Sequence, residues 1–208
     1  MTNLLFPDSF GYADLGSFVA RARRANSGGA VRLHAHGDVL GVYAEILPGQ
    51  ALFADGAVVG VRGIQLGEPA DLDVTVASAA LAERFARSAT GPVLAVPPAT
   101  VQAPWAGALP GPGERWDLVG ELPAQVLDEA AVAGIAVVSA AGSEPLGGYE
   151  AVRDRVWAAP TATDPAVPAG AAFGARVLGF LVPGEVVQVY RRGRWSRLRT
   201  DRGHVLAR

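Results

Sequence analysis

The apolar residues of this chain change their spacing twice in the same direction, from the period of a helix to the period of a strand. Residues 14–25 carry apolar side chains at i, i+3, i+4 and i+7, and residues 30–66 then alternate apolar and polar positions. The same order returns in residues 169–182 and 186–206. Helices and half-buried strands must cover one another's apolar sides. The order therefore predicts an α+β fold of antiparallel meanders packed with helices, in two pseudo-duplicated halves.

A second repeated pattern lies between these segments, where a short strand runs straight into a helix. One strand ends near Val76 and leads to a helix with Leu81, and another ends near Leu122 and leads to a helix with Leu127. A shift of 46 residues superposes the two segments. They therefore indicate the same duplication.

Local signals predict the boundaries of several elements. Asp14 is an N-cap residue for the first helix, and Gly37–Asp38 fits a two-residue hairpin turn. Asp55–Gly56 marks a further tight turn, after the apolar pair Leu52–Phe53. The apolar run Ile135–Ala140 is interpreted as a strand.

Proline density marks the boundary between the halves. Six of the 15 prolines lie between Pro92 and Pro112, as expected of a surface connection. We therefore predict an N-terminal α+β half at residues 1–97, a Pro/Gly-rich connection at residues 98–115 and a C-terminal α+β half at residues 116–208.

The composition excludes several classes of protein. Cysteine is absent, which excludes disulfides and thiol chemistry, and no apolar run approaches the roughly 18 residues of a membrane span. The first residues lack the basic and apolar regions of a signal peptide. We expect a soluble, cytoplasmic protein with no cofactor and no membrane partner. Half of the residues are apolar and only 18% are charged. We therefore also expect a homo-oligomer, in which part of the apolar surface is buried between subunits.

Positive charge is concentrated at the end of the chain. Residues 191–208 hold seven arginines and one acid, whereas the residues before them hold 11 arginines and 19 acids. Alternation places Trp195, Arg197 and Arg199 on one face of a strand, which suits phosphates and stacked bases. The candidate polyanion-binding residues are Arg191, Arg192, Arg194, Trp195, Arg197, Arg199 and Arg202. Alternatively, these arginines stack on Trp195 and Tyr190 or pair with the acidic remainder of the chain.

One string of residues has the chemistry of a metal site. The string His34-Ala35-His36-Gly37-Asp38 resembles the signature of metallo-β-lactamase-type hydrolases, in which two histidines one residue apart share a face. Val39 stands where that family has its next histidine, and only His204 remains elsewhere. We therefore predict no metal site, with His34, His36 and Asp38 as the only candidates. A strand edge facing solvent accounts for the same residues.

Two further resemblances concern larger segments. The glycines and apolar residues of 179–189, followed by Trp195, Leu198 and Gly203–Val205, are similar to bacterial Src-homology-3-like barrels. Across nearly its full length, the chain resembles a group of uncharacterised actinobacterial proteins. Shared features include the strand that starts near residue 29 and the ending Arg202–Leu206. This resemblance implies no activity.

No set of residues in the sequence identifies a catalytic nucleophile or a general acid–base pair. We therefore predict no catalytic residues, and a non-enzymatic protein that acts through protein–protein or homo-oligomeric surfaces. Binding of nucleic acid or another polyanion by the basic C-terminal sheet is the first alternative. A hydrolase with a site near His34 and His36 is the second.

Overall fold

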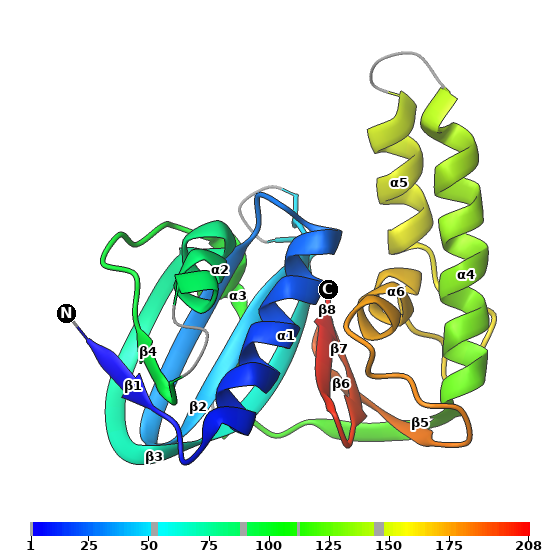
Figure 1. The fold of residues 1–208 in the computed structure, drawn as a ribbon. Helices are drawn as coiled ribbons and strands as arrows, with labels where there is room; N and C mark the ends of the chain where they lie inside the picture. Colours follow the sequence, from blue (N-terminus) through cyan, green and yellow to red (C-terminus); the bar gives the residue numbers. More distant parts are fainter. Residues whose placement is uncertain (1, 51–53, 88–90, 112, 144–147) are drawn as a thin grey trace.

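The computed structural model describes the chain except residues 1, 51–53, 88–90, 112 and 144–147, and it confirms the predicted α+β class (Figure 1). Its main sheet has six antiparallel strands: β2 (Ala30–Leu47), β3 (Val58–Ala77), β5 (Asp117–Pro123), β6 (Val186–Arg192), β7 (Trp195–Thr200) and β8 (Gly203–Ala207). Their order in space is β2-β3-β8-β7-β6-β5. A second, two-stranded sheet pairs β1 (Asn3–Leu5) with β4 (Val93–Ala95).

The first helix, α1 (Ser9–Ala25), begins before the expected cap. Asp8 is the N-cap, and its carboxylate accepts hydrogen bonds from two backbone N–H groups of the first turn at 2.9 and 3.0 Å. Asp14 lies inside the helix and pairs with Arg62 of β3 at 2.6 Å. Either aspartate could cap the helix. Because Asp14 pairs with Arg62, which is distant in the sequence, Asp8 is the residue that caps it.

Strands β2 and β3 form one long antiparallel hairpin, which corrects the expected meander of residues 30–66. Gly37 does not turn the chain, because pairing continues from Gly37 with Ala70 to Val39 with Gln65 across a bulge. The backbone of Gly37 has a φ of 61°, in the left-handed region that glycine adopts readily. A bulge reverses which positions face the core: odd-numbered residues of β2 are buried before it and even-numbered residues after it.

The true connection of this hairpin is residues 48–57, where the sequence predicts the Asp55–Gly56 turn. Gly56 has a φ of 80° there. The pair Leu52–Phe53, expected before the turn, lies outside the described residues.

Both predicted junctions between a strand and a helix are confirmed. β3 runs directly into α2 (Ser78–Arg87), and β5 runs directly into α4 (Ala124–Ala140). The superposed pairs Val76 with Leu122 and Leu81 with Leu127 are buried, with exposures between 0% and 4%. Equivalent apolar positions therefore enter the core in both halves.

The backbone at the two junctions is also equivalent. The N–H of Ser78 donates to the carbonyl of Gly29 at 3.0 Å, and the N–H of Ala124 donates to the carbonyl of Glu185 at 2.9 Å. Each acceptor immediately precedes the strand that pairs with the junction, β2 or β6. This shared construction supports the predicted duplication of the halves.

The prediction of a strand at Ile135–Ala140 is wrong, because α4 continues through it. Leu127, Ala131, Gly134 and Val138 follow helical spacing and form its buried face. Gly134 allows Trp157 to approach, since a Cβ there would lie 2.4 Å from the indole ring. Trp157 belongs to α5 (Gly148–Ala158), which pairs with α4 in a helical hairpin that projects beyond the sheet (Figure 1).

The three C-terminal strands have their predicted order, after a helix α6 (Ala169–Val177) that is shorter than the expected 169–182. Gly179, with a φ of 71°, ends the helical segment. β3 and β5 continue the sheet on either side of β6, β7 and β8. The three strands therefore belong to an open sheet and not to a separate small barrel.

The two halves meet inside the sheet, where Val58–Val61 of β3 pairs with His204–Ala207 of β8. Helix α6 packs against both strands. The predicted connection at residues 98–115 also has a structural role. Its helix α3 (Pro104–Ala108) buries Trp105 against Trp195, on the face of the sheet opposite α1 and α6. In the part of the chain that the structure describes, no helix is long and apolar enough to cross a membrane.

Candidate functional site

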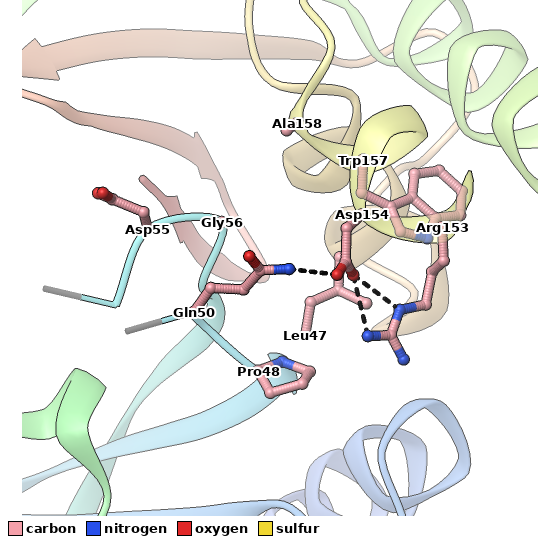
Figure 2. Close-up of a pocket in the computed structure, with 9 residues that line it drawn as sticks. All are labelled: Leu47, Pro48, Gln50, Asp55, Gly56, Arg153, Asp154, Trp157 and Ala158. Carbon is pink, nitrogen blue, oxygen red and sulfur yellow. Dashed lines mark hydrogen bonds and ion pairs between the residues drawn. The ribbon is translucent and has the colours of Figure 1, made fainter. Parts of the chain in front are cut away.

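A groove runs along the boundary between the two halves, between the end of β2 and the hairpin of α4 and α5. It consists of two adjoining hollows with volumes of about 190 and 300 Å³, and both are lined by Leu47, Pro48, Arg153 and Trp157. We call it the seam groove. Figure 2 shows the smaller hollow, with β2 contributing one wall and α5 the other.

The floor of the seam groove is apolar. Leu47 and Trp157 are buried, and the Trp157 ring stacks on Phe173 of α6 with the ring centroids 4.5 Å apart. Ile135 and Val138 of α4 line the larger hollow. Apolar hollows with a few polar groups at the edge are typical of ligand and peptide sites.

The polar rim of the groove is held together across the two halves. The Gln50 side chain donates a hydrogen bond to Asp154 of α5, as Figure 2 shows. Arg153 donates to the same carboxylate through Nε at 3.1 Å and through an Nη at 2.9 Å. Arg153 and Asp154 thus balance one another, and the groove carries little net charge of its own.

Sequence reasoning missed the seam groove because its walls are distant in the chain. Leu47 and Trp157 lie more than a hundred residues apart, and no local pattern joins them. The only local signal is the break of the alternation at Pro48, where the apolar edge of β2 ends.

The candidate polyanion-binding residues are spread over two faces and edges of the C-terminal sheet. Arg192 pairs with Glu114 of the connection, and Arg194 lies 3.5 Å from Asp55 of the N-terminal half. Arg191 donates to the carbonyl of Ala166 at 2.7 Å.

Trp195 is only 5% exposed beneath α3, so its ring does not present a stacking surface to solvent. Arg197 lies over two rings, with its guanidinium carbon 4.7 Å from the centroid of Trp116 and 4.4 Å from that of Tyr190. Burial lowers the pKa of Arg197, and neighbouring Arg199 lowers it further. The guanidinium groups of Arg199 and Arg202 make no hydrogen bond or ion pair with any residue that the structure describes.

Acidic side chains, a backbone carbonyl and aromatic rings of the protein therefore contact Arg191, Arg192, Arg194 and Arg197. This geometry matches the alternative in which the arginines stack and pair within the protein.

The metal candidates lie on the edge strand β2. His34 and His36 face the same side, opposite Asp73 and Asp71 of β3 respectively, and Asp38 accepts a hydrogen bond from the Gln65 amide at 2.9 Å. Arg32 binds the carboxylate of Asp73 through two bonds of 2.7 Å. Among the described residues, no three histidine or acidic side chains are grouped in a way that could hold a metal ion.

Two family models match consecutive parts of the chain. The model of a domain of unknown function, DUF8010, matches residues 1–107, and that of another, DUF8185, matches residues 111–208. No curated protein matches the chain.

Among solved structures, the chain is similar to the β sliding clamp of C. crescentus, crystallised with PEG bound to a proposed beta-motif tethering region. The identity is 13% and the TM-score is 0.53, and the match covers 99% of this chain and 64% of the clamp chain. At this identity, the likeness shows the fold alone.

Proposed function

This chain belongs to the DUF8010 family of domains of unknown function, and we propose that it is a protein-interaction protein whose seam groove binds an apolar peptide segment of a partner. The observation that carries the proposal is the pair of adjoining apolar hollows between the two halves. The clamp of similar fold has a proposed region for tethering a beta-motif, which favours the same class of function.

The chemistry of the groove suggests what the peptide contains. One or two bulky apolar side chains fit above Leu47 and Trp157, and backbone amides reach the polar rim at Gln50 and Arg153. Each buried apolar anchor contributes about 1.5–3 kcal/mol, which ordering of the peptide partly offsets. We therefore expect weak binding, with dissociation constants on the order of 0.1–1 mM.

A displayed library of random peptides tests this proposal. Enriched peptides should share an apolar motif, and their affinity is then measured by fluorescence anisotropy. Arg153→Glu breaks the rim and should weaken binding by about tenfold, the effect of roughly 1.4 kcal/mol. The matched control is Arg155→Glu on the exposed side of the same helix, which should leave binding unchanged.

The absence of cysteine offers a second readout. A fluorophore on Gln50→Cys should change its emission when the peptide binds, whereas one on Glu68→Cys, an exposed residue in the bulge of β3, should not. A library without a shared motif overturns the proposal. So does a peptide whose binding ignores both Arg153→Glu and the label at position 50.

Self-association is a second candidate, and the edge of the sheet at β5 favours it. Among the described strands, β5 pairs only with β6, and it exposes Leu118 and Val119. An exposed edge with apolar side chains invites another strand, although the bulge after Leu118 and the acids of β5 oppose this.

Sedimentation at increasing protein concentration tests self-association. Val119→Glu should abolish any dimer, and Val137→Glu, on the exposed face of α4, should not. If the protein stays monomeric, or if only Val137→Glu acts, the edge of β5 is not an interface.

A further inference from the structure

A hollow lined by arginines lies at the other end of β8 from the seam groove. Its volume is about 390 Å³, and its lining includes Arg62, Arg199, Arg202 and His204. An adjoining hollow of about 260 Å³ shares Arg62 and Arg202 and also contains Arg21. Four arginines, from α1, β3, β7 and the turn after it, therefore line these two adjoining hollows.

Arg62 forms a fixed wall of this hollow. Its guanidinium holds both carboxylate oxygens of Asp14, at 2.6 and 2.7 Å, and donates to the backbone carbonyl of Arg202 at 2.5 Å. Because Asp14 neutralises its charge, Arg62 helps to form the wall of the hollow but adds little net positive charge to it. The carbonyl contact also positions the turn that carries Arg202.

The remaining positive charge in the hollow is not balanced in the same way. Arg199 and Arg202 are exposed, and their guanidinium groups have no partner among the described residues. Asp201, on the turn between β7 and β8, is the one acid on this rim apart from Asp14. The rim thus has two free guanidinium groups against one carboxylate.

His204 lies beside this positive charge. It lies opposite Arg199 in the sheet, and its Nδ1 is buried without a hydrogen-bond partner. Burial lowers the pKa of His204, and together with the positive charges of Arg197 and Arg199 it brings that pKa to about 4. A neutral ring, two free guanidinium groups and an open hollow therefore lie together.

We propose that this hollow binds a compact oxyanion of the phosphate class between Arg199, Arg202 and His204. The flat fork of N–H groups on a guanidinium matches the oxygens of a phosphate in two bonds at once. The anion supplies the negative charge that this corner lacks. The site is separate from the seam groove, so it does not depend on the proposed peptide function.

Titration with inorganic phosphate, followed by nuclear magnetic resonance of the histidine rings and arginine Nε–H groups, tests the proposal. Ionic strength is held constant with sodium chloride. Phosphate should produce saturable shifts at His204, Arg199 and Arg202 and none at His34 and His36 on β2. The bound anion should also raise the pKa of His204 from about 4. Pyrophosphate, with more charge, should bind more tightly than phosphate.

Arg199→Gln and Arg202→Gln should each weaken phosphate binding by about tenfold, the loss of one charge-assisted contact. Arg155→Gln, far away on α5, serves as the control. Shifts that fail to saturate, that chloride reproduces, or that persist in both variants overturn the proposal. A single-stranded oligonucleotide provides the last arm. If it binds more tightly than pyrophosphate and depends on Arg191 and Arg194, the site is a polyanion surface and not a compact anion site.

Discussion

In the N-terminal half, helices α1 and α2 lie against two strands of 18 and 20 residues, whereas in the C-terminal half, α4 and α6 lie against four strands of five to seven residues. The difference is smaller than the lengths suggest. The bulge divides the long hairpin into two paired parts, residues 30–37 with 70–77 and residues 39–47 with 58–65. Both halves therefore contain four strand segments of similar length. A bulge and one hairpin connection join them in the first half, whereas in the second half turns join β6, β7 and β8, and helices α4 to α6 separate β5 from β6.

The comparison explains how one sheet can unite two halves. Strands twist, and long flat pairs are strained unless a bulge lets them bend. With that bend, the first half presents the edge at Val58–Val61 to β8 of the second half. The seam groove opens beside this joint, at the ends of β2 and α5. Substitutions at equivalent positions test whether the two halves are built alike and whether each depends on the other for its stability.

Removal of a buried leucine at equivalent positions should have the largest effect. Leu81→Ala and Leu127→Ala each empty a fully buried site and should lower the free energy of unfolding by about 2–5 kcal/mol. Because the halves share a sheet, each variant should unfold in one transition in urea, followed by fluorescence. Two separate transitions would instead make the predicted halves, residues 1–97 and 116–208, independent domains.

Acid should destabilise the protein through His204 in the second half. Its folded pKa of about 4 lies below the ordinary 6.5, so the unfolded chain binds the proton more readily. The neutral ring's contribution is complete above pH 6.5 and is lost as the pH falls toward 4. We expect about 2–3 kcal/mol, allowing for partial exposure. His204→Gln should remove this pH dependence, and His34→Gln on β2 should retain it. Equal acid responses in both variants would contradict the assignment.

A methyl group at the joint should test how closely the halves fit. A Cβ on Gly60 would lie 2.3 Å from a terminal carbon of buried Leu178, after α6, whereas one on Gly63 meets nothing within 4 Å. Gly60→Ala should lower the free energy of unfolding by about 1–2 kcal/mol through overpacking. Thermal unfolding of Gly63→Ala, in the same strand, provides the matched comparison. If the two variants melt alike, the joint is looser than described.

The smallest effect is expected at Glu45 of β2, whose response to acid is opposite to that of His204. Burial raises the pKa of Glu45, against hydrogen bonds from Ala30 and Asn26. The folded state therefore favours the proton, and stability falls as the pH rises above the ordinary 4.5. Glu45→Gln should stabilise the protein at neutral pH by less than about 1 kcal/mol, and this gain should vanish in acid. A stability loss at neutral pH would mean that the carboxylate's hydrogen bonds outweigh its burial.

The sequence predicted elements more reliably than it predicted their connections. The junctions at Val76 and Leu122 could be found because strand and helix periods are local. At Gly37, a left-handed glycine suits a hairpin turn and a bulge equally well, and only the register with β3 decides between them. Asp14 was assigned a cap that belongs to Asp8, because its partner Arg62 lies in another element.

For the candidate sites too, local patterns were predictable from the sequence and contacts between distant residues were not. The concentration of arginines after residue 190 was visible, but the residues that balance them were not. Glu114 and Asp55 reach Arg192 and Arg194 only in the folded chain. Apart from the break of the alternation at Pro48, the seam groove had no local signal, since neither half alone contains both of its walls.

The position of β8 has a consequence for synthesis of the chain on the ribosome. β3 is complete early, but the strand that covers its outer edge at Val58–Val61 is made about 140 residues later. At about 5–20 residues per second, that edge stays unpaired for roughly 7–28 s. During this time it is an unpaired template for other strands. Because Val58–Val61 carries no charged residue of its own, the nascent hairpin is open to pairing with other chains until β8 is made.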